Sequence, residues 1–104
     1  MFGGTMLNIE QLDVNGKSVQ GTMVVAPGGE GHPNMILVQG SKGYLMCGYL
    51  NLAAAEKFGD AAVLVGGADF AAVLANPIKD MTEAARQSGV KDGMTGAEAA
   101  AVLA

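Results

Sequence analysis

The sequence has one cysteine, one histidine and only six basic residues in 104. One cysteine excludes a disulfide within the chain and agrees with a reducing compartment, although a disulfide between subunits stays open. A zinc site would have to recruit carboxylates such as Glu30, and the usual ligand spacing is lacking, so we predict no metal and no cofactor. The basic residues are scattered and the net charge is −4, which argues against a nucleic-acid partner.

Long apolar runs and targeting segments are also lacking. The longest apolar stretch covers residues 61–75 and is interrupted at Gly66, Gly67 and Asp69. It is shorter than the roughly 20 residues that a membrane-spanning helix needs. The N-terminus has no cationic segment followed by an apolar one, so we predict no signal peptide. We therefore expect a cytoplasmic protein with no membrane partner.

Half of the residues are nevertheless hydrophobic, and only 15% are charged. A chain of this length has room for one core, so a monomer would expose apolar patches of the kind that mark contact surfaces. We therefore predict a homo-oligomer. The alternative is that alanine and glycine, which cover little apolar area, account for the hydrophobic fraction.

The two halves of the chain predict different secondary structure. The first half carries β-branched residues, methionine and glycine-rich turns, and Asn15 with Gly16 favours a two-residue hairpin turn. The expected strands cover residues 7–14, 18–26, 35–38 and 44–47. Sixteen of the seventeen alanines lie beyond residue 52, so helices are expected there.

Capping residues place the expected helices of the second half. Asn51 caps a helix that runs to Phe58, and Asp69 caps a short helix that follows a buried strand over residues 61–65. Two patterns resemble capping boxes, Asp80 with Glu83 and Thr95 with Glu98. The expected order is ββββαβααα. This is an α/β protein, of an α+β-like two-layer kind, with a mainly antiparallel sheet from the N-terminal half and helices from the C-terminal half packed on it.

The single cysteine lies where the fourth strand gives way to a helix. Gly48 permits a sharp bend before the cap, so the sulfur of Cys47 could face solvent near helix N-terminal amides, which stabilise a thiolate. The elbow motif is incomplete, because Tyr49 stands where a second glycine belongs. The alternative is that Cys47 is a small buried hydrophobe, the commoner environment of cysteine. Cys47 is therefore a candidate nucleophile, and the alternative is that it only packs in the core.

Other residues near this block are weaker candidates. His32, in the loop over residues 27–33, could act as a general base toward Cys47, or it could be a solvated loop residue. Gly66 and Gly67 are interpreted as a turn, because neither a dinucleotide-binding fingerprint nor a Walker motif is present. The candidate binding residues are Lys42, Gly43, Tyr44, Gly48, Tyr49 and Asn51.

The block KGYLMCGYLN over residues 42–51 and the pattern GMTGAEA over residues 93–99 resemble the YunC-like family, small prokaryotic α/β proteins grouped as a domain of unknown function. The resemblance covers residues 6–103. It implies a compact fold, a prokaryotic cytosolic origin and self-association, and it implies no known activity. Residues 1–5 are interpreted as a remnant of cloning or an alternative start, which leaves one YunC-like domain over residues 6–104.

Two functional hypotheses follow. The first is a homo-oligomeric ligand-binding or interaction module, with the turn at Cys47 in a pocket or a subunit contact and an unknown small molecule as ligand. The second is a small enzyme that uses Cys47 as a nucleophile or redox thiol. A purely structural role for Cys47 would leave the glycines serving only turns.

Overall fold

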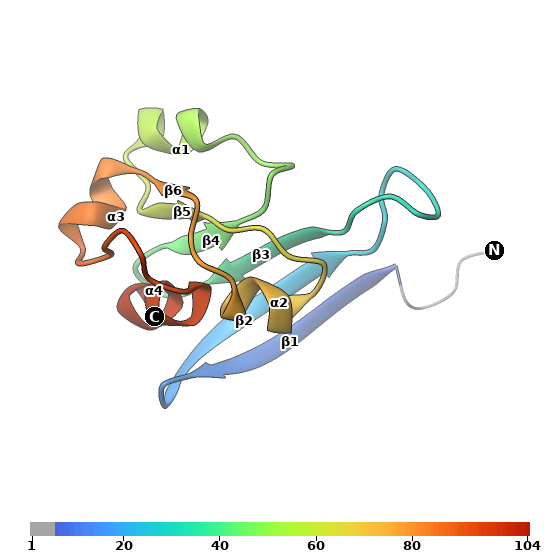
Figure 1. Cartoon of the computed structure of the whole chain (residues 1–104), viewed down its shortest axis with the longest axis horizontal. Coiled ribbons are helices and arrows are strands. Elements are labelled where there is room, and N and C mark those ends of the chain that lie inside the picture. The colour runs from blue at the N-terminus through green and yellow to red at the C-terminus, as the bar shows by residue number, and fades with distance from the viewer. Residues whose placement is uncertain (1–5) are drawn as a thin grey trace.

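A computed structural model describes residues 6–104 as a six-stranded sheet with four helices (Figure 1). The strands are β1 (Leu7–Val14), β2 (Lys17–Val24), β3 (Met35–Gln39), β4 (Tyr44–Met46), β5 (Ala62–Leu64) and β6 (Asp80–Met81). The helices are α1 (Leu52–Phe58), α2 (Phe70–Ala75), α3 (Glu83–Gln87) and α4 (Gly96–Leu103). The strands lie in chain order, and all neighbours are antiparallel except β4 and β5, which are parallel. The α/β fold class is confirmed.

Local chemistry sets most of these boundaries. Asn15 and Gly16 have φ angles of 54° and 81°, as the tight turn between β1 and β2 requires. The side chain of Asn51 accepts hydrogen bonds from the first amides of α1. Asp69 does the same for α2, and Thr95 forms a reciprocal capping box with Glu98 at α4. These caps confirm three of the four expected helix starts.

The fourth start was wrong. The structure adds a short strand, β6, at Asp80, so the order becomes ββββαβαβαα. Thr82 caps α3 by accepting a hydrogen bond from the amide of Ala85, while the carboxylate of Asp80 accepts one from the amide of Met81. The reason is tertiary. The amides of Lys79 and Thr82 donate to the carbonyls of Leu64 and Ala62, and this pairing with β5 extends the backbone that a helix cap at Asp80 would have needed.

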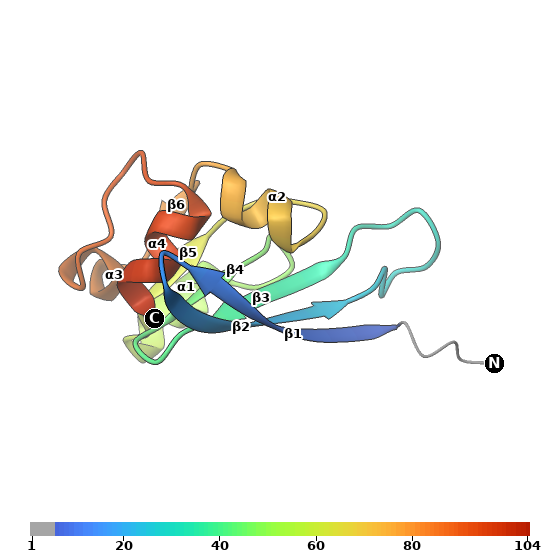
Figure 2. The same ribbon diagram turned by 90° about the horizontal axis from the view of Figure 1, so that it is seen from below.

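The two faces of the sheet carry separate cores. Alternate residues such as Val38, Leu45 and Val63 point to an inner face, on which α2, α3 and α4 pack. Figure 2 shows α2 and α4 on one side of the sheet. The smaller core, with Met46 and Ala62, lies on the other face beneath α1. The sheet is therefore covered on both faces only around β4 and β5.

The opposite face of β1, β2 and β3, called the outer face here, has no helix over it. Its side chains include Ile9, Thr22 and Leu37, which stand in one row across the three strands. Ile9 is 60% exposed and Leu7 is 54% exposed. No helix within residues 6–104 has the length and apolar character to cross a membrane.

Candidate functional site

The carboxyl ends of the parallel strands β4 and β5 meet at one edge of the sheet, where a cavity of about 350 Å³ opens. Ligands commonly bind beyond the carboxyl ends of parallel strands, because the chain leaves the sheet there and the loops diverge. The cavity is lined by Pro33, Asn34, Cys47, Gly48, Tyr49, Gly66 and Gly67. The segment after β4 and the segment after β5 thus form two of its walls.

Cys47 forms part of the wall that follows β4. Its side chain is buried, with 6% of the residue exposed, and its sulfur accepts a hydrogen bond from the amide of Ile36 at 3.3 Å. The amide of Cys47 donates in turn to the carbonyl of Ile36 at 3.2 Å. The amide of Leu50 then donates to the Cys47 carbonyl at 3.1 Å and closes a turn. The thiol is a fixed part of the sheet end and is not presented to solvent.

Two asparagines hold the other walls in place. Asn34 accepts a hydrogen bond from the amide of Ala26 at 2.9 Å and donates to the carbonyl of Ala68 at 2.8 Å. It therefore ties the loop before β3 to the loop after β5. Asn76 donates to the carbonyl of Gly66 at 2.8 Å. Within residues 6–104 the amides of Gly66 and Gly67 donate no hydrogen bond to the protein.

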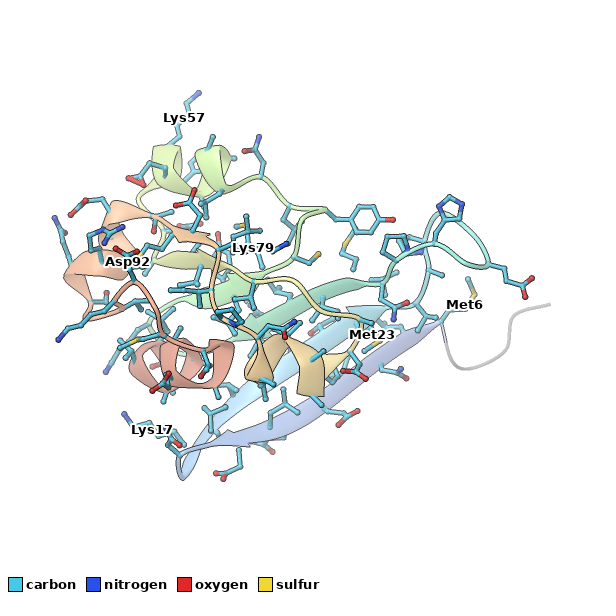
Figure 3. All side chains as sticks on the ribbon, in the orientation of Figure 1. Met6, Lys17, Met23, Lys57, Lys79 and Asp92 are labelled. Carbon is cyan, nitrogen blue, oxygen red and sulfur yellow. The ribbon has the colours of Figure 1, made fainter. Side chains whose placement is uncertain are left out.

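A second cavity of about 380 Å³ adjoins the first at Gly66 and Gly67, and Lys79 lines it. The Nζ atom of Lys79 lies 3.0 Å from the point where a Cβ on Gly66 would stand, so the glycine leaves room for the ammonium group. Arg86 with Asp92 is the only ion pair within the described part of the chain, so Lys79 has no carboxylate partner there. Lys79 and Lys57 are both exposed, and in the view of Figure 3 Lys79 lies over the body of the molecule whereas Lys57 extends beyond its border.

Three of the expected binding residues lie at the opposite end of β4. The amide of Lys42 donates to the carbonyl of Leu103 at 2.9 Å. Gly43 lies against the carbonyl of Ala61 so closely that a side chain would not fit. The hydroxyl of Tyr44 donates to Asp60 at 2.7 Å, and burial together with this carboxylate raises the pKa of Tyr44 to about 12.

The remaining residues that the sequence analysis singled out also divide between the cavity and other places. Gly48 and Tyr49 stand beside Cys47 in the cavity wall, whereas Asn51 acts as the cap of α1. His32 is exposed and its ring lies against Gly28 of its own loop, 2.9 Å from the position of a Cβ there. It is not among the residues, within 6–104, that line the cavity with Cys47. The structure does not bring His32 and Cys47 together as a pair.

Sequence reasoning missed Asn34 and Lys79. Asn34 could have been found, because β3 and β4 were both expected and their antiparallel register, continued past Met46, places Asn34 opposite Tyr49. Lys79 could not, because its position depends on the unexpected strand β6. Within residues 6–104 no group of three or more histidine, cysteine, aspartate or glutamate side chains could hold a metal ion.

Comparison with known proteins gives a family and a similar structure, and neither has an assigned activity. A family model described as "Domain of unknown function (DUF1805)" matches residues 46–103, which include Cys47, Gly48, Tyr49, Gly66 and Gly67. No curated protein matches the chain. The crystal structure of a protein of unknown function, TA1206 from Thermoplasma acidophilum, is 30% identical, with a TM-score of 0.84. The likeness covers 100% of this chain and 99% of that one, so it extends over the whole fold.

Proposed function

The chain belongs to the DUF1805 family, whose function is unknown, and we propose that it is a binding module for a small molecule held at the carboxyl ends of β4 and β5. The observation that carries this proposal is the cavity of about 350 Å³, a volume within the range of small-molecule sites. Cys47 and Pro33 supply apolar wall, while Asn34, Tyr49 and the glycine backbone supply polar groups. Such a mixture is typical of sites that orient a small ligand.

The proposed ligand carries an acidic group. Free backbone amides bind anions, and Gly66 and Gly67 provide two neighbouring ones at the rim shared by both cavities. The ammonium group of Lys79 stands over Gly66 and adds an unpaired positive charge. The carboxylate of Asp69 is engaged by the amide of Ala72, which reduces its repulsion of an anion.

A nuclear magnetic resonance titration tests this proposal. The probes are inorganic phosphate and acetate, with acetamide as the neutral match for acetate. We expect the anions to shift the amide signals of Gly66 and Gly67, and acetamide to shift them less. Lys79→Gln should weaken anion binding by about threefold to tenfold, whereas Lys57→Gln, on the exposed surface of α1, should leave it unchanged. Equal shifts with acetamide would contradict the acidic ligand.

A cavity-filling variant tests the location of the site. Nothing lies within 4 Å of a Cβ built on Gly48, a residue of the cavity wall, so a side chain added there starts in open space beside the cavity. Gly48→Leu should abolish the shifts and Gly48→Ala should weaken them. Anion shifts that persist unchanged in Gly48→Leu would place the binding elsewhere.

The alternative function, a thiol enzyme that uses Cys47, has less support. Among the cavity-lining residues, only Cys47 and Tyr49 carry side chains that titrate, so no histidine or carboxylate stands ready as a general base. The burial of Cys47 also restricts the approach of a substrate to the sulfur.

Self-association is part of the proposal. It is supported by the uncovered outer face, where Leu7 and Ile9 are more than half exposed. The cytoplasmic location and the prokaryotic origin that the YunC-like resemblance implies belong to the same proposal.

A further inference from the structure

We propose that two copies of this chain associate through the free edge of β1, with the β1 strands antiparallel about a two-fold axis at Ile9. This inference rests on the self-association proposed above and gives it an interface. β1 is the first strand of the sheet, and within residues 6–104 no strand pairs with its outer edge. Figure 1 shows β1 along one border of the sheet with no helix or strand beyond it.

The free edge of β1 is suited to pairing with another strand. Soluble proteins usually protect a long edge strand with proline, lysine or a bulge. β1 contains neither proline nor lysine over Leu7–Val14 and pairs with β2 at each residue without a bulge, and its charged residues are Glu10 and Asp13. Met6, Leu7 and Ile9 are three of the five large hydrophobic side chains that the described residues expose. An edge without proline, lysine or a bulge and an exposed apolar surface therefore coincide at the start of β1.

The hydrogen bonds of β1 determine which of its residues can pair outward. Val14 faces Lys17 across the two-residue turn, and the amide of Val25 donates to the carbonyl of Met6 at 2.9 Å. Even-numbered residues of β1 therefore bond to β2. Because the direction alternates along a strand, the odd-numbered residues from Leu7 to Asp13 direct their N–H and C=O groups to the free edge.

Charge then selects the register. A two-fold axis at Glu10 would set two carboxylates directly opposite each other, which is unfavourable. An axis at Gln11 would set the carboxylate of Asp13 opposite Ile9 of the partner subunit and leave Leu7 beyond the paired stretch. An axis at Ile9 pairs Ile9 with its own copy and uses outward-directed backbone groups. Asp13 then lies outside the overlap of residues 6–12.

The side chains agree with this register on both faces. On the outer face Leu7 stands opposite Gln11 of the partner subunit, beside a hollow of about 450 Å³ lined in part by Ile9 and Gln11. On the inner face Asn8 stands opposite Glu10 of the partner subunit, where an amide can donate to a carboxylate. The two outer faces join with the two Ile9 side chains at the centre and one Leu7 on either side of them. The same patch thus serves both subunits, as a two-fold interface requires.

Cysteine cross-linking tests the register in a Cys47→Ala background, which removes the native thiol. Residues directly opposite in a bonded antiparallel pair have Cα atoms about 5.5 Å apart, within disulfide range. Ile9→Cys should therefore give a covalent dimer on mild oxidation. Gln11→Cys is the register control, because four residues of offset separate its two copies by about 13 Å. Thr22→Cys is the face control, because it lies beside Ile9 on β2 and three strand spacings of about 4.8 Å separate its copies.

Sedimentation of the unmodified chain and of Ile9→Pro completes the test. The amide of Ile9 points to the free edge and donates no hydrogen bond to β2. Proline at this position therefore removes a hydrogen bond from the dimer and none from the subunit, and edge strands accept proline at such positions. Ile9→Pro should change a dimer into a monomer with an unchanged circular dichroism spectrum. Cross-linking of Thr22→Cys as fast as Ile9→Cys would overturn the β1 interface, and equally fast cross-linking of Gln11→Cys would overturn the two-fold axis at Ile9. Either outcome would leave self-association intact. A monomeric native chain over about two decades of concentration would overturn both the interface and self-association.

Discussion

The amide of Ile36 donates a hydrogen bond to the sulfur of Cys47 at 3.3 Å, and this contact fixes the only thiol at the end of β4. Because the sulfur is buried and bonded, iodoacetamide should alkylate the native chain at least about tenfold more slowly than the urea-unfolded chain. Mass spectrometry over time gives both rates. Equal rates would show an accessible sulfur and would favour thiol chemistry over packing.

Tyr44 and Asp60 predict a loss of stability at high pH. The pKa of Tyr44 is raised to about 12 in the folded chain, whereas the unfolded chain titrates near the ordinary value of 10.0. The unfolded state therefore releases the phenolic proton first. The stabilisation is fully present below about pH 10 and is lost as the pH rises toward 12. Because Tyr44 is only half-buried, we expect about 1 kcal/mol.

Urea unfolding of Tyr44→Phe and of the native chain at pH 8 and pH 11 measures this contribution. The difference in the free energy of unfolding between Tyr44→Phe and the native chain should shrink at the higher pH. Tyr49 has no aspartate partner among the described residues, so Tyr49→Phe should show no such change. A difference that stays constant with pH would contradict the role of the hydrogen bond to Asp60.

Much of the fold could be predicted because its boundaries are local. Asn15 with Gly16, Asn51 and the Thr95 capping box each act through backbone groups within four residues, so the sequence contains the whole interaction. The strand β6 could not be predicted in this way. Its two residues are extended because of bonds to β5, some twenty residues earlier in the chain. Two polar residues at the spacing of a capping box, such as Asp80 and Glu83, have the same local sequence whether the first begins a helix or lies in a strand.

The candidate site was predictable only in part, for the same reason. The block around Cys47 was singled out as one unit, but a strand runs through it and separates its ends. Lys42 and Tyr44 lie at one end of β4, and Cys47 and Tyr49 lie at the other. The second wall, at Gly66, comes from the parallel neighbour β5, and its proximity follows from sheet order rather than from residue type.

Thr82 joins α3, β5 and the loop before β5 through one buried hydroxyl. Its Oγ1 donates to the carbonyl of Asp60 at 2.7 Å and accepts from the amides of Ala62 and Ala85 at 3.0 and 3.2 Å. Thr82→Val keeps the shape and leaves these buried groups unpaired, so it should lower the free energy of unfolding by about 2 to 3 kcal/mol. Thr82→Ser keeps the hydroxyl and loses only the methyl group, so it should lower the free energy of unfolding by about 1 kcal/mol or less. Urea unfolding compares them, and equal losses would assign the effect to packing alone.

Gly40 allows the turn between β3 and β4 to hold the end of α4. The amide of Lys42 donates to the carbonyl of Leu103 at 2.9 Å, and the hydroxyl of Ser41 donates to the carbonyl of Ala104 at 3.1 Å. These bonds satisfy carbonyls that a helix end leaves free. A Cβ on Gly40 would meet the Leu103 carbonyl and would stand 2.7 Å from the Cα of Ala104, and neither is a flexible side-chain atom.

Gly40→Ala should therefore lower the free energy of unfolding by about 2 kcal/mol or more, because the turn and α4 must separate. It should also speed hydrogen exchange of the α4 amides relative to those of β2, since the loss begins where α4 meets the turn. Gly48→Ala is the matched control, since nothing lies within 4 Å of its Cβ position, and its effect should stay within about 0.5 kcal/mol. Similar losses in the two variants would show that glycine's backbone freedom, rather than the contact with α4, sets the requirement at residue 40.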